Sequence, residues 1–415
     1  MKKILSIVLV VFMLVAVLAG CGEKKNDQPS QSASSSPPAQ TSSAPPAPDT
    51  GSSSGTGLPT GVPTLNADAA KRADEAYAFI ADLKQKASAY NRSAAKYRYT
   101  LNCQDPAESA AGEFCYAWSD AVLVATEGAI NIDVGVSNAY CPGGTMEALN
   151  DTKAGSIDFV WTLPCYYDGY MPLTLVIQNP SLGIQNATVG QFAMWELYKD
   201  NKAIQDEIAQ HGEAMFIYAN NPSPLSYKGN KEVTSVGDIT GQIRGNKGPA
   251  QLFINEIGAS VYGCPIGEVY QNVKTGVIDY LITDWHAIAS FKLADQGVLN
   301  YYLDTNVGCS AYALIGNDKV WSDIVKNGYG DAVKSVSGDF CLNLIGIWEA
   351  YEARGRSDAT TNGGTIYAPN AALAGELQTA YDNVAKAWVA ANGSNAQAVY
   401  DKTLELVNKY NGIYK

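Results

Sequence analysis

Hydrophobic residues repeat with two alternating periods along the chain from about residue 67 onward. Amphipathic stretches with helical spacing predict helices, and short runs rich in β-branched and aromatic residues predict strands. The predicted segments are, in order, helix 67–94, strand 97–102, helix 112–126, strand 129–136, helix 145–154, strand 157–162, helix 189–210 and strand 214–218. Strands that are separated by helices indicate an α/β fold with a largely parallel sheet.

Segments that directly follow these strands are the first candidates for a ligand site. Ligands of open α/β sheets bind outside the carboxyl ends of the strands. The segments are 104–109, 163–170 and 219–223. The candidate residues at these strand ends are Gln104, Tyr166, Tyr167 and Tyr218.

A further predicted strand, 277–282, is followed by two more candidates, Thr283 and Trp285. Aromatic rings offer flat apolar walls with polar tips, which suits a cleft that closes over a ligand. Most of the 25 tyrosines must nevertheless lie in the core or on the surface, so position after a strand is what selects the candidates. The neighbouring His286 is interpreted as the first turn of a helix that reaches Leu293, not as a ligand contact.

The amino terminus has the pattern of a bacterial lipoprotein signal. Lys2 and Lys3 precede the uncharged apolar run 4–18, which is shorter than the roughly 20 residues of a membrane span. Residues 18–21 (LAGC) match a lipobox, so we expect residues 1–20 to be removed and Cys21 to carry the lipid. Two acyl chains would anchor the protein to the outer face of the cytoplasmic membrane. The alternative is an ordinary signal peptide with an incidental cysteine.

Residues 21–64 are predicted to be a disordered tether between the lipid and the folded body. Between residues 23 and 63 the chain is rich in Ser, Pro, Gln, Thr and Gly, and this composition cannot bury enough surface to fold. A flexible chain of about 40 residues reaches roughly 35 Å. The remaining stretch of about 350 residues is enough for two lobes.

Charge and cysteine content exclude several classes of protein. The formal net charge of −12 repels nucleic acid and anionic lipid headgroups. With Cys21 acylated, seven cysteines remain, an odd number that prevents complete pairing. Cys103 and Cys115 could form a bridge, or the cysteines could serve as small buried apolar residues. The chain has no CxxC motif and only two histidines, so we expect no metal and no cofactor.

Arg244 is the strongest single candidate for binding an anion. It is the only arginine between residues 99 and 353. A guanidinium is permanently charged and donates in a fork that matches both oxygens of a carboxylate. Asn246, two residues further on, is taken as a neighbour in the same site. The alternative is a surface arginine paired with an acidic residue.

Several sequence blocks resemble, in order, the solute receptors of TRAP transporters. The resemblance extends from about residue 97 to the carboxyl terminus. The blocks are 142–149 (PGGTMEAL), 153–158 (KAGSID), 163–169 (LPCYYDG), 171–174 (MPLT), 195–198 (WELY), 236–244 (VGDITGQIR), 267–270 (GEVY), 274–279 (KTGVID) and 364–367 (GTIY). The segment 236–244 resembles the one that leads into the family's carboxylate-binding arginine, and 364–367 resembles its late hairpin.

The resemblance implies a two-lobed periplasmic-binding-protein-like fold of type II, with the ligand between lobes joined by crossing strands. The lobes would be 96–218 with 308–345, and 219–307, after an N-terminal helix in 65–95 and before bracing helices in 346–415. It implies a receptor for a small organic acid that delivers its ligand to TRAP permease subunits in the membrane. An ABC permease or a sensor kinase is the alternative partner.

Many members of the family carry a second arginine after the strand that corresponds to 214–218, but residues 219–226 (ANNPSPLS) contain none. A second buried carboxylate would therefore lack a partner, which favours a monocarboxylate. Lys228, Lys231 or Lys247 could supply a second charge, although lysines in loops are usually solvated. A secreted hydrolase is the rival from another class. It would have His211 as its plausible base for serine chemistry, or a pair of carboxylates for glycoside cleavage.

Overall fold

The computed structural model describes residues 63, 65–167 and 169–414. The predicted signal peptide, Cys21 and the predicted tether apart from residue 63 lie outside the described residues. Among the helices of the described part, none is both long and apolar enough to cross a membrane.

The first of two sheets has five strands in the order β2-β1-β3-β10-β4. The strands are β1 (Tyr97–Cys103), β2 (Ile130–Gly135), β3 (Phe159–Thr162), β4 (Glu213–Ala219) and β10 (Ala311–Gly316). Strand β1 pairs in parallel with β2 and β3, because α2 (Ala110–Ala125) and α3 (Ala148–Ala154) carry the chain back between them. Ser109 caps α2 by accepting a hydrogen bond from the Gly112 amide.

The second sheet has six short strands in the order β11-β9-β5-β8-β6-β7. The strands are β5 (Leu225–Tyr227), β6 (Gln242–Arg244), β7 (Ser260–Tyr262), β8 (Tyr280–Ile282), β9 (Tyr301–Leu303) and β11 (Thr365–Tyr367). The helices α6 (Pro249–Glu256), α7 (Ile266–Lys274) and α8 (Trp285–Ser290) follow β6, β7 and β8. Strand β6, which ends at Arg244, pairs in parallel with both β7 and β8.

Two chain segments without a helix cross between the sheets, one from β4 to β5 and one from β9 to β10, and a third connection runs from β10 to β11 through α9, α10 and α11. The two helix-free crossing segments lie side by side. They are hydrogen-bonded to each other: the Asn220 amide donates to Ser310 O at 2.9 Å, and the Ser223 amide donates to Gly308 O at 2.7 Å. Strands β5 and β10, which arrive from the other sheet without a helix between, run antiparallel to their neighbours. Both sheets are therefore mixed, and the expectation of a largely parallel sheet is wrong for the crossing strands.

Three further elements differ from the sequence-based prediction. Helix 67–94 ends earlier, as α1 (Ala69–Ala87), and a short 3-10 helix follows at Arg92–Ala94. Helix 189–210 is two helices, α4 (Ala187–Asp200) and α5 (Lys202–Ala209), because Asn201 is extended and its side chain caps α5. The segment 364–367 is not a hairpin, since β11 pairs in parallel with β9.

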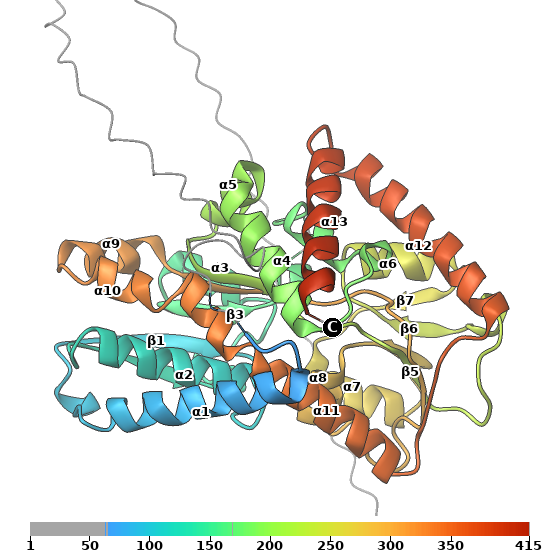
Figure 1. The fold of residues 1–415 in the computed structure, drawn as a ribbon, viewed down its shortest axis with the longest axis horizontal. Coiled ribbons are helices and arrows are strands. Elements are labelled where there is room, and N and C mark those ends of the chain that lie inside the picture. The colour runs from blue at the N-terminus through green and yellow to red at the C-terminus, as the bar shows by residue number, and fades with distance from the viewer. Residues whose placement is uncertain (1–62, 64, 168, 415) are drawn as a thin grey trace, which may run out of the picture. The chain divides into compact units, whose positions relative to one another are not determined.

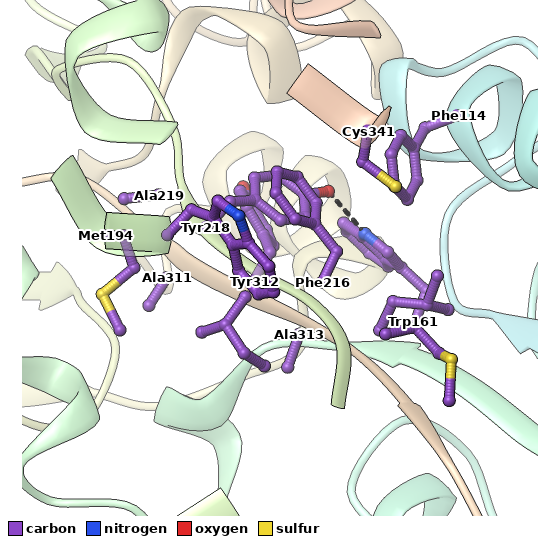
Figure 2. Close-up of a cluster of buried hydrophobic side chains, with 14 of the residues drawn as sticks. Phe114, Trp161, Met194, Phe216, Tyr218, Ala219, Ala311, Tyr312, Ala313 and Cys341 are labelled. Carbon is purple, nitrogen blue, oxygen red and sulfur yellow. Dashed lines mark hydrogen bonds between the residues drawn. The ribbon is translucent and has the colours of Figure 1, made fainter. Parts of the chain in front are cut away.

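The core of the first sheet contains a cluster of stacked aromatic rings among its aliphatic side chains (Figure 2). Phe216 and Tyr218 of β4 stack with their ring centroids 4.8 Å apart, and Tyr312 of β10 stacks on Trp161 of β3 at 4.9 Å. The Trp161 indole N–H donates to the Tyr218 hydroxyl at 2.7 Å, so neither buried polar group is left unpaired. Trp161 also lines the site described below, so the core fixes one of its walls.

Five further helices complete the described part: α9 (Asp318–Lys326), α10 (Gly330–Ser335), α11 (Gly346–Thr361), α12 (Ala371–Ala391) and α13 (Ala396–Ile413). Helix α12, which runs toward α13 in red in Figure 1, contributes Leu377 and Tyr381 to the core of the second sheet. Trp388, further along the same helix, packs into the core of the first sheet. One helix therefore takes part in both hydrophobic cores.

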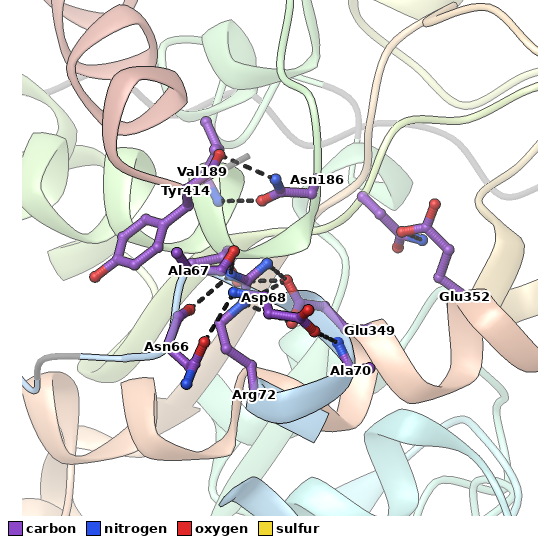
Figure 3. Close-up of polar contacts among 12 residues, drawn as sticks. Asn66, Ala67, Asp68, Ala70, Arg72, Asn186, Val189, Glu349, Glu352 and Tyr414 are labelled. Carbon is purple, nitrogen blue, oxygen red and sulfur yellow. Dashed lines mark hydrogen bonds and ion pairs between the residues drawn. The ribbon is translucent and has the colours of Figure 1, made fainter. Parts of the chain in front are cut away.

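Helix α1 is held to α11 by a buried ion pair (Figure 3). The Arg72 guanidinium donates to both oxygens of Glu349, at 2.6–2.9 Å, and both side chains are buried. Arg72 also donates to the carbonyls of Asn66 and Ala67, and Thr188 of α4 donates to Glu349. Both side chains are buried, so removing either one would leave the charge of the other buried without a counter-ion.

The seven cysteines from Cys103 to Cys341 are all free thiols, and all except Cys264 are buried. Burial is the leading cause of the raised pKa of Cys309 and Cys341. These thiols behave as small apolar residues, which was one of the two alternatives. No group of His, Cys, Asp and Glu side chains suited to a metal ion occurs among the residues the structure describes.

Candidate ligand-binding site

A small cavity is lined by strand ends and adjoining helices of both sheets. Its walls come from the segments after β1, β3 and β8, from the end of β6, and from β10. The lining residues are Gln104, Asp105, Trp161, Leu163, Tyr166, Arg244, Asn246, Ile266, Thr283, Asp284, His286, Ala287, Phe291, Ser310 and Tyr312. The free volume is about 20 Å³, which is room for about one water molecule.

Arg244 lies at the end of β6 and is 2% exposed. Its guanidinium donates to Cys264 O at 3.2 and 3.3 Å, to Ile282 O at 3.4 Å and to the Tyr166 hydroxyl at 3.3 Å. All four bonds are long, and all go to neutral acceptors. No carboxylate of the described residues forms an ion pair with this arginine.

Tyr166 joins Arg244 to the first sheet. It lies in the 3-10 helix Pro164–Tyr166 after β3. Burial raises the pKa of its hydroxyl to about 12, so the ring stays neutral and offers one O–H group beside the guanidinium. The contact between Tyr166 and Arg244 therefore brings a residue of each sheet to the same wall of the cavity.

Opposite charges gather around His286 at another wall of the cavity. The ring Nδ1 forms an ion pair with Asp284, and Nε2 lies 4.0 Å from Asp105 Oδ2. Tyr312 donates its hydroxyl to Asp284 Oδ2 at 3.0 Å, and the Asn220 amide nitrogen lies 2.6 Å from His286 Nδ1. All five side chains are buried.

This cluster shifts the pKa of its members in opposite directions. Burial would lower the pKa of His286, but the carboxylates of Asp284 and Asp105 outweigh it and raise the pKa to about 9. Burial would raise the pKa of Asp284, but His286 and the Ala287 amide outweigh it and lower the pKa. His286 and Asp284 are therefore an imidazolium and a carboxylate at neutral pH.

Five of the eight candidate ligand residues from the sequence line the cavity: Gln104, Tyr166, Arg244, Asn246 and Thr283. Tyr167 instead donates its hydroxyl to Thr145 O and accepts from the Leu149 amide. Tyr218 is fully buried in the core of the first sheet. Trp285 packs into the core around α8 and lies under the guanidinium of Arg356, at 4.6 Å from its ring centroid.

Three residues of the cavity, Asp105, Asp284 and His286, were not among the eight candidates from the sequence, although Asp105 lies in the candidate segment 104–109. His286 lies in the first turn of α8, as predicted, and it also lines the cavity. Asp284 caps the same helix by accepting a hydrogen bond from the Ala287 amide. An aspartate directly after a strand and before a helix is the one sequence signal that could have pointed to this position.

Of the three lysines considered as second cations, Lys228 and Lys231 do not line the cavity. Lys247 lines a neighbouring hollow of about 470 Å³ that shares Tyr166 and Asn246 with the cavity. This larger hollow extends the site on the side of the loop that follows β6.

The comparison with protein families gives a match over most of the chain. Residues 101–392 match the model for the bacterial extracellular solute-binding proteins of family 7, DctP. The outer membrane transporter protein TsaT of Comamonas testosteroni is 22% identical over 302 residues, which are 68% of this chain and 83% of that protein.

Solved structures with the same fold cover the folded part. A TRAP solute-binding protein from a marine metagenome, specific for aromatic acid ligands and bound to metahydroxyphenylacetate, superposes with a TM-score of 0.69 at 20% identity. This covers 76% of this chain and 99% of that chain. A TRAP solute-binding protein of Bordetella bronchiseptica with bound mandelate gives a TM-score of 0.67 at 22% identity, covering 75% and 99%. The predicted two-lobed α/β fold is confirmed by these likenesses.

Proposed function

Because the chain belongs to family 7 of the bacterial extracellular solute-binding proteins, we propose that it captures a small organic monocarboxylate and delivers it to the permease of a TRAP-type secondary transporter. Family membership makes the chain a receptor and not an enzyme, so the hydrolase alternative is set aside. Its place of action is extracytoplasmic, as for the family.

The Arg244 guanidinium, which forms no ion pair with a carboxylate of the described residues, carries the proposal. A guanidinium stays protonated at any physiological pH, and burying it without a counter-ion is costly. Its present acceptors are neutral oxygens at 3.2–3.4 Å. A ligand carboxylate would replace these long bonds with short, charge-assisted ones in a bidentate geometry.

A single carboxylate suits the site better than two. Asp105 and Asp284 lie in the same cavity as Arg244, so a second carboxylate of a ligand would meet like charges there. His286, the other cation of the lining, is already paired with Asp284. Ligands bound in similar structures support the class: metahydroxyphenylacetate, mandelate and benzoate each carry one carboxylate.

Ligand entry requires the two walls of the cavity to separate. A free volume of about 20 Å³ is far below the roughly 300–1,000 Å³ of typical ligand pockets. The two hydrogen-bonded crossing segments between the sheets are the natural place for such a motion, since only loop residues there need to change conformation. Closure around the ligand would then mark the form that the permease recognises.

Acylation of Cys21 would keep the receptor at the membrane, close to its permease. This part of the proposal rests on the sequence 18–21 (LAGC) alone. Mass spectrometry of the mature protein tests it, because a lipidated amino-terminal cysteine adds the mass of its acyl chains.

Isothermal titration and thermal-shift measurements on the full chain test the ligand class. The panel contains benzoate, mandelate, phenylacetate, succinate and a neutral sugar. A monocarboxylate at 100 times its Kd should stabilise the protein by about 2.7 kcal/mol. Arg244→Gln removes the charge and the fork, so we expect its affinity to fall by about 100-fold or more.

Arg98→Gln is the matched control, because Arg98 is an exposed arginine of β1 that pairs with Asp133 on the surface. It should bind like the wild type. Equal binding by Arg244→Gln, or stabilisation by the neutral sugar alone, would show that the carboxylate proposal is wrong.

A further inference from the structure

The polar groups of the cavity divide into a donor side and an acceptor side. Arg244 supplies donors from the second sheet. Gln104 and Asp105, in the segment after β1, line the cavity, and their Oε1 and Oδ1 atoms are buried without a hydrogen-bond partner. Within the described residues, these are the only two side-chain atoms of the lining that are buried and unpaired. Both are acceptors.

Of these two acceptors, the Asp105 carboxylate oxygen is the more costly to leave unpaired. It is 2% exposed, and its nearest cation, His286 Nε2, lies 4.0 Å from the other carboxylate oxygen. An unpaired buried carboxylate oxygen costs more than an unpaired neutral one, because the charge has lost its water. The structure thus holds in place an acceptor that no described residue satisfies, and a ligand with a donor can satisfy it.

We propose that the ligand carries, besides the carboxylate that binds Arg244, a hydrogen-bond donor that binds Asp105 and Gln104. The inference rests on the proposed function and narrows it to hydroxy acids and amino acids. An acid without such a donor would cover Asp105 Oδ1 and leave it unpaired. A binding site discriminates strongly against ligands that leave its buried polar groups unpaired, so we expect such an acid to bind more weakly.

A hydroxyl donor and an ammonium donor would differ in their effect on the charge balance of the cavity. His286 and Asp284 balance each other as an imidazolium and a carboxylate. Arg244 and Asp105 remain, and a ligand with only a carboxylate leaves one excess negative charge among buried groups. A hydroxyl satisfies Oδ1 without changing this balance, whereas an ammonium group satisfies the hydrogen bond and restores neutrality.

The test uses two series of acids that differ only in the donor. One series is phenylacetate, mandelate and phenylglycine, and the other is propionate, lactate and alanine. Calorimetry on the full chain measures each Kd for the wild type, Asp105→Asn and Asp105→Ala. In the wild type, a donor-bearing acid should bind about 10- to 100-fold more tightly than the acid without a donor in its series.

The two Asp105 variants show whether the donor of the ligand is an ammonium group or a hydroxyl group. Preference for an ammonium should disappear in Asp105→Asn, which lacks the charge, whereas preference for a hydroxyl should survive there and disappear in Asp105→Ala. Asp331→Asn, at an exposed aspartate of α10 outside the cavity, is the control and should keep the wild-type preference. If a variant does not fold, the comparison within the wild type still decides whether a donor is required.

Three results would overturn the inference. Equal affinities within both series in the wild type would show that no donor is needed, while leaving the receptor proposal intact if Arg244→Gln still abolishes binding. A donor preference that persists in Asp105→Ala would show that Asp105 does not bind the donor. Failure of every acid to bind would instead overturn the proposed function, and the inference with it.

Discussion

His286 is the residue whose ionisation should dominate the pH dependence of stability above neutrality. Its pKa is raised from 6.5 to about 9 by Asp284 and Asp105 against the effect of burial. A raised pKa means that the folded state holds the proton more tightly than the unfolded chain does. The stabilisation is therefore complete below about pH 6.5 and is lost as the pH rises through about 9.

Urea unfolding at pH 6.5 and at about pH 9.5 measures this contribution. The free energy of unfolding of the wild type should fall by up to about 3 kcal/mol over this range. His286→Gln should show a smaller fall. His211→Gln serves as the control: burial lowers the pKa of His211, so this residue titrates below the range and the variant should behave as the wild type. Equal falls in the wild type and His286→Gln would contradict the assignment.

Single residues of the site differ in how far the sequence identifies them. Arg244 stands out because arginine is scarce in this part of the chain, and scarcity is visible in a sequence. Asp105 and Asp284 do not stand out among 41 acidic residues, since burial depends on the tertiary structure. Position after a strand also does not give the direction of a side chain. Tyr166 therefore lines the cavity, whereas the adjacent Tyr167 bonds to Thr145 and Leu149.

At the scale of elements, α11 packs closely against two other helices through glycines. A Cβ atom at Gly346 would lie 2.1 Å from Arg72 O of α1, and a Cβ atom at Gly355 would lie 2.2 Å from Trp285 O of α8. Both neighbours are backbone atoms and cannot move aside alone. Glycine at these positions sets how near α1 and α8 approach α11, and α8 carries His286.

Gly355→Ala should lower the free energy of unfolding by about 1–3 kcal/mol, because the helices must move apart. Gly375→Ala is the matched control: a methyl group at this exposed glycine of α12 would have no neighbouring atom within 4 Å, so alanine should stabilise the helix by about 0.5–1 kcal/mol. Chemical denaturation of both variants checks the prediction. A stabilised Gly355→Ala would mean that the contact between α11 and α8 is looser than the structure indicates.

The sequence predicts four of the five strands of the first sheet, β1 to β4, and the helices α2 and α3 between them, because these segments alternate regularly in apolar periodicity. It misses the break at Asn201, where one polar residue caps a new helix within a continuous helical pattern. It does not predict β5 or β10 as strands, and it therefore misses their antiparallel direction, which depends on which sheet the chain enters. Periodicity along the chain contains no such information.

At the scale of the whole chain, the family prediction is confirmed by the match over residues 101–392, and the fold by the similar structures. No single sequence block is specific for the family, but many short blocks occur in the family's order and spacing, and together they identify it. Lipidation of Cys21 and the exact lobe boundaries stay predictions. The sharing of α12 between two cores could not be predicted, because a continuous apolar stripe does not show where one core ends and the next begins.

The small cavity has a consequence for kinetics. If this closed form predominates without ligand, association must wait for opening, and the observed binding rate should level off as the ligand concentration rises. Stopped-flow fluorescence can follow this, since Trp161 lines the cavity. A rate that increases linearly up to high concentration would mean that the free receptor is mostly open. A receptor of this kind responds to its ligand no faster than it opens, whatever the concentration outside the cell.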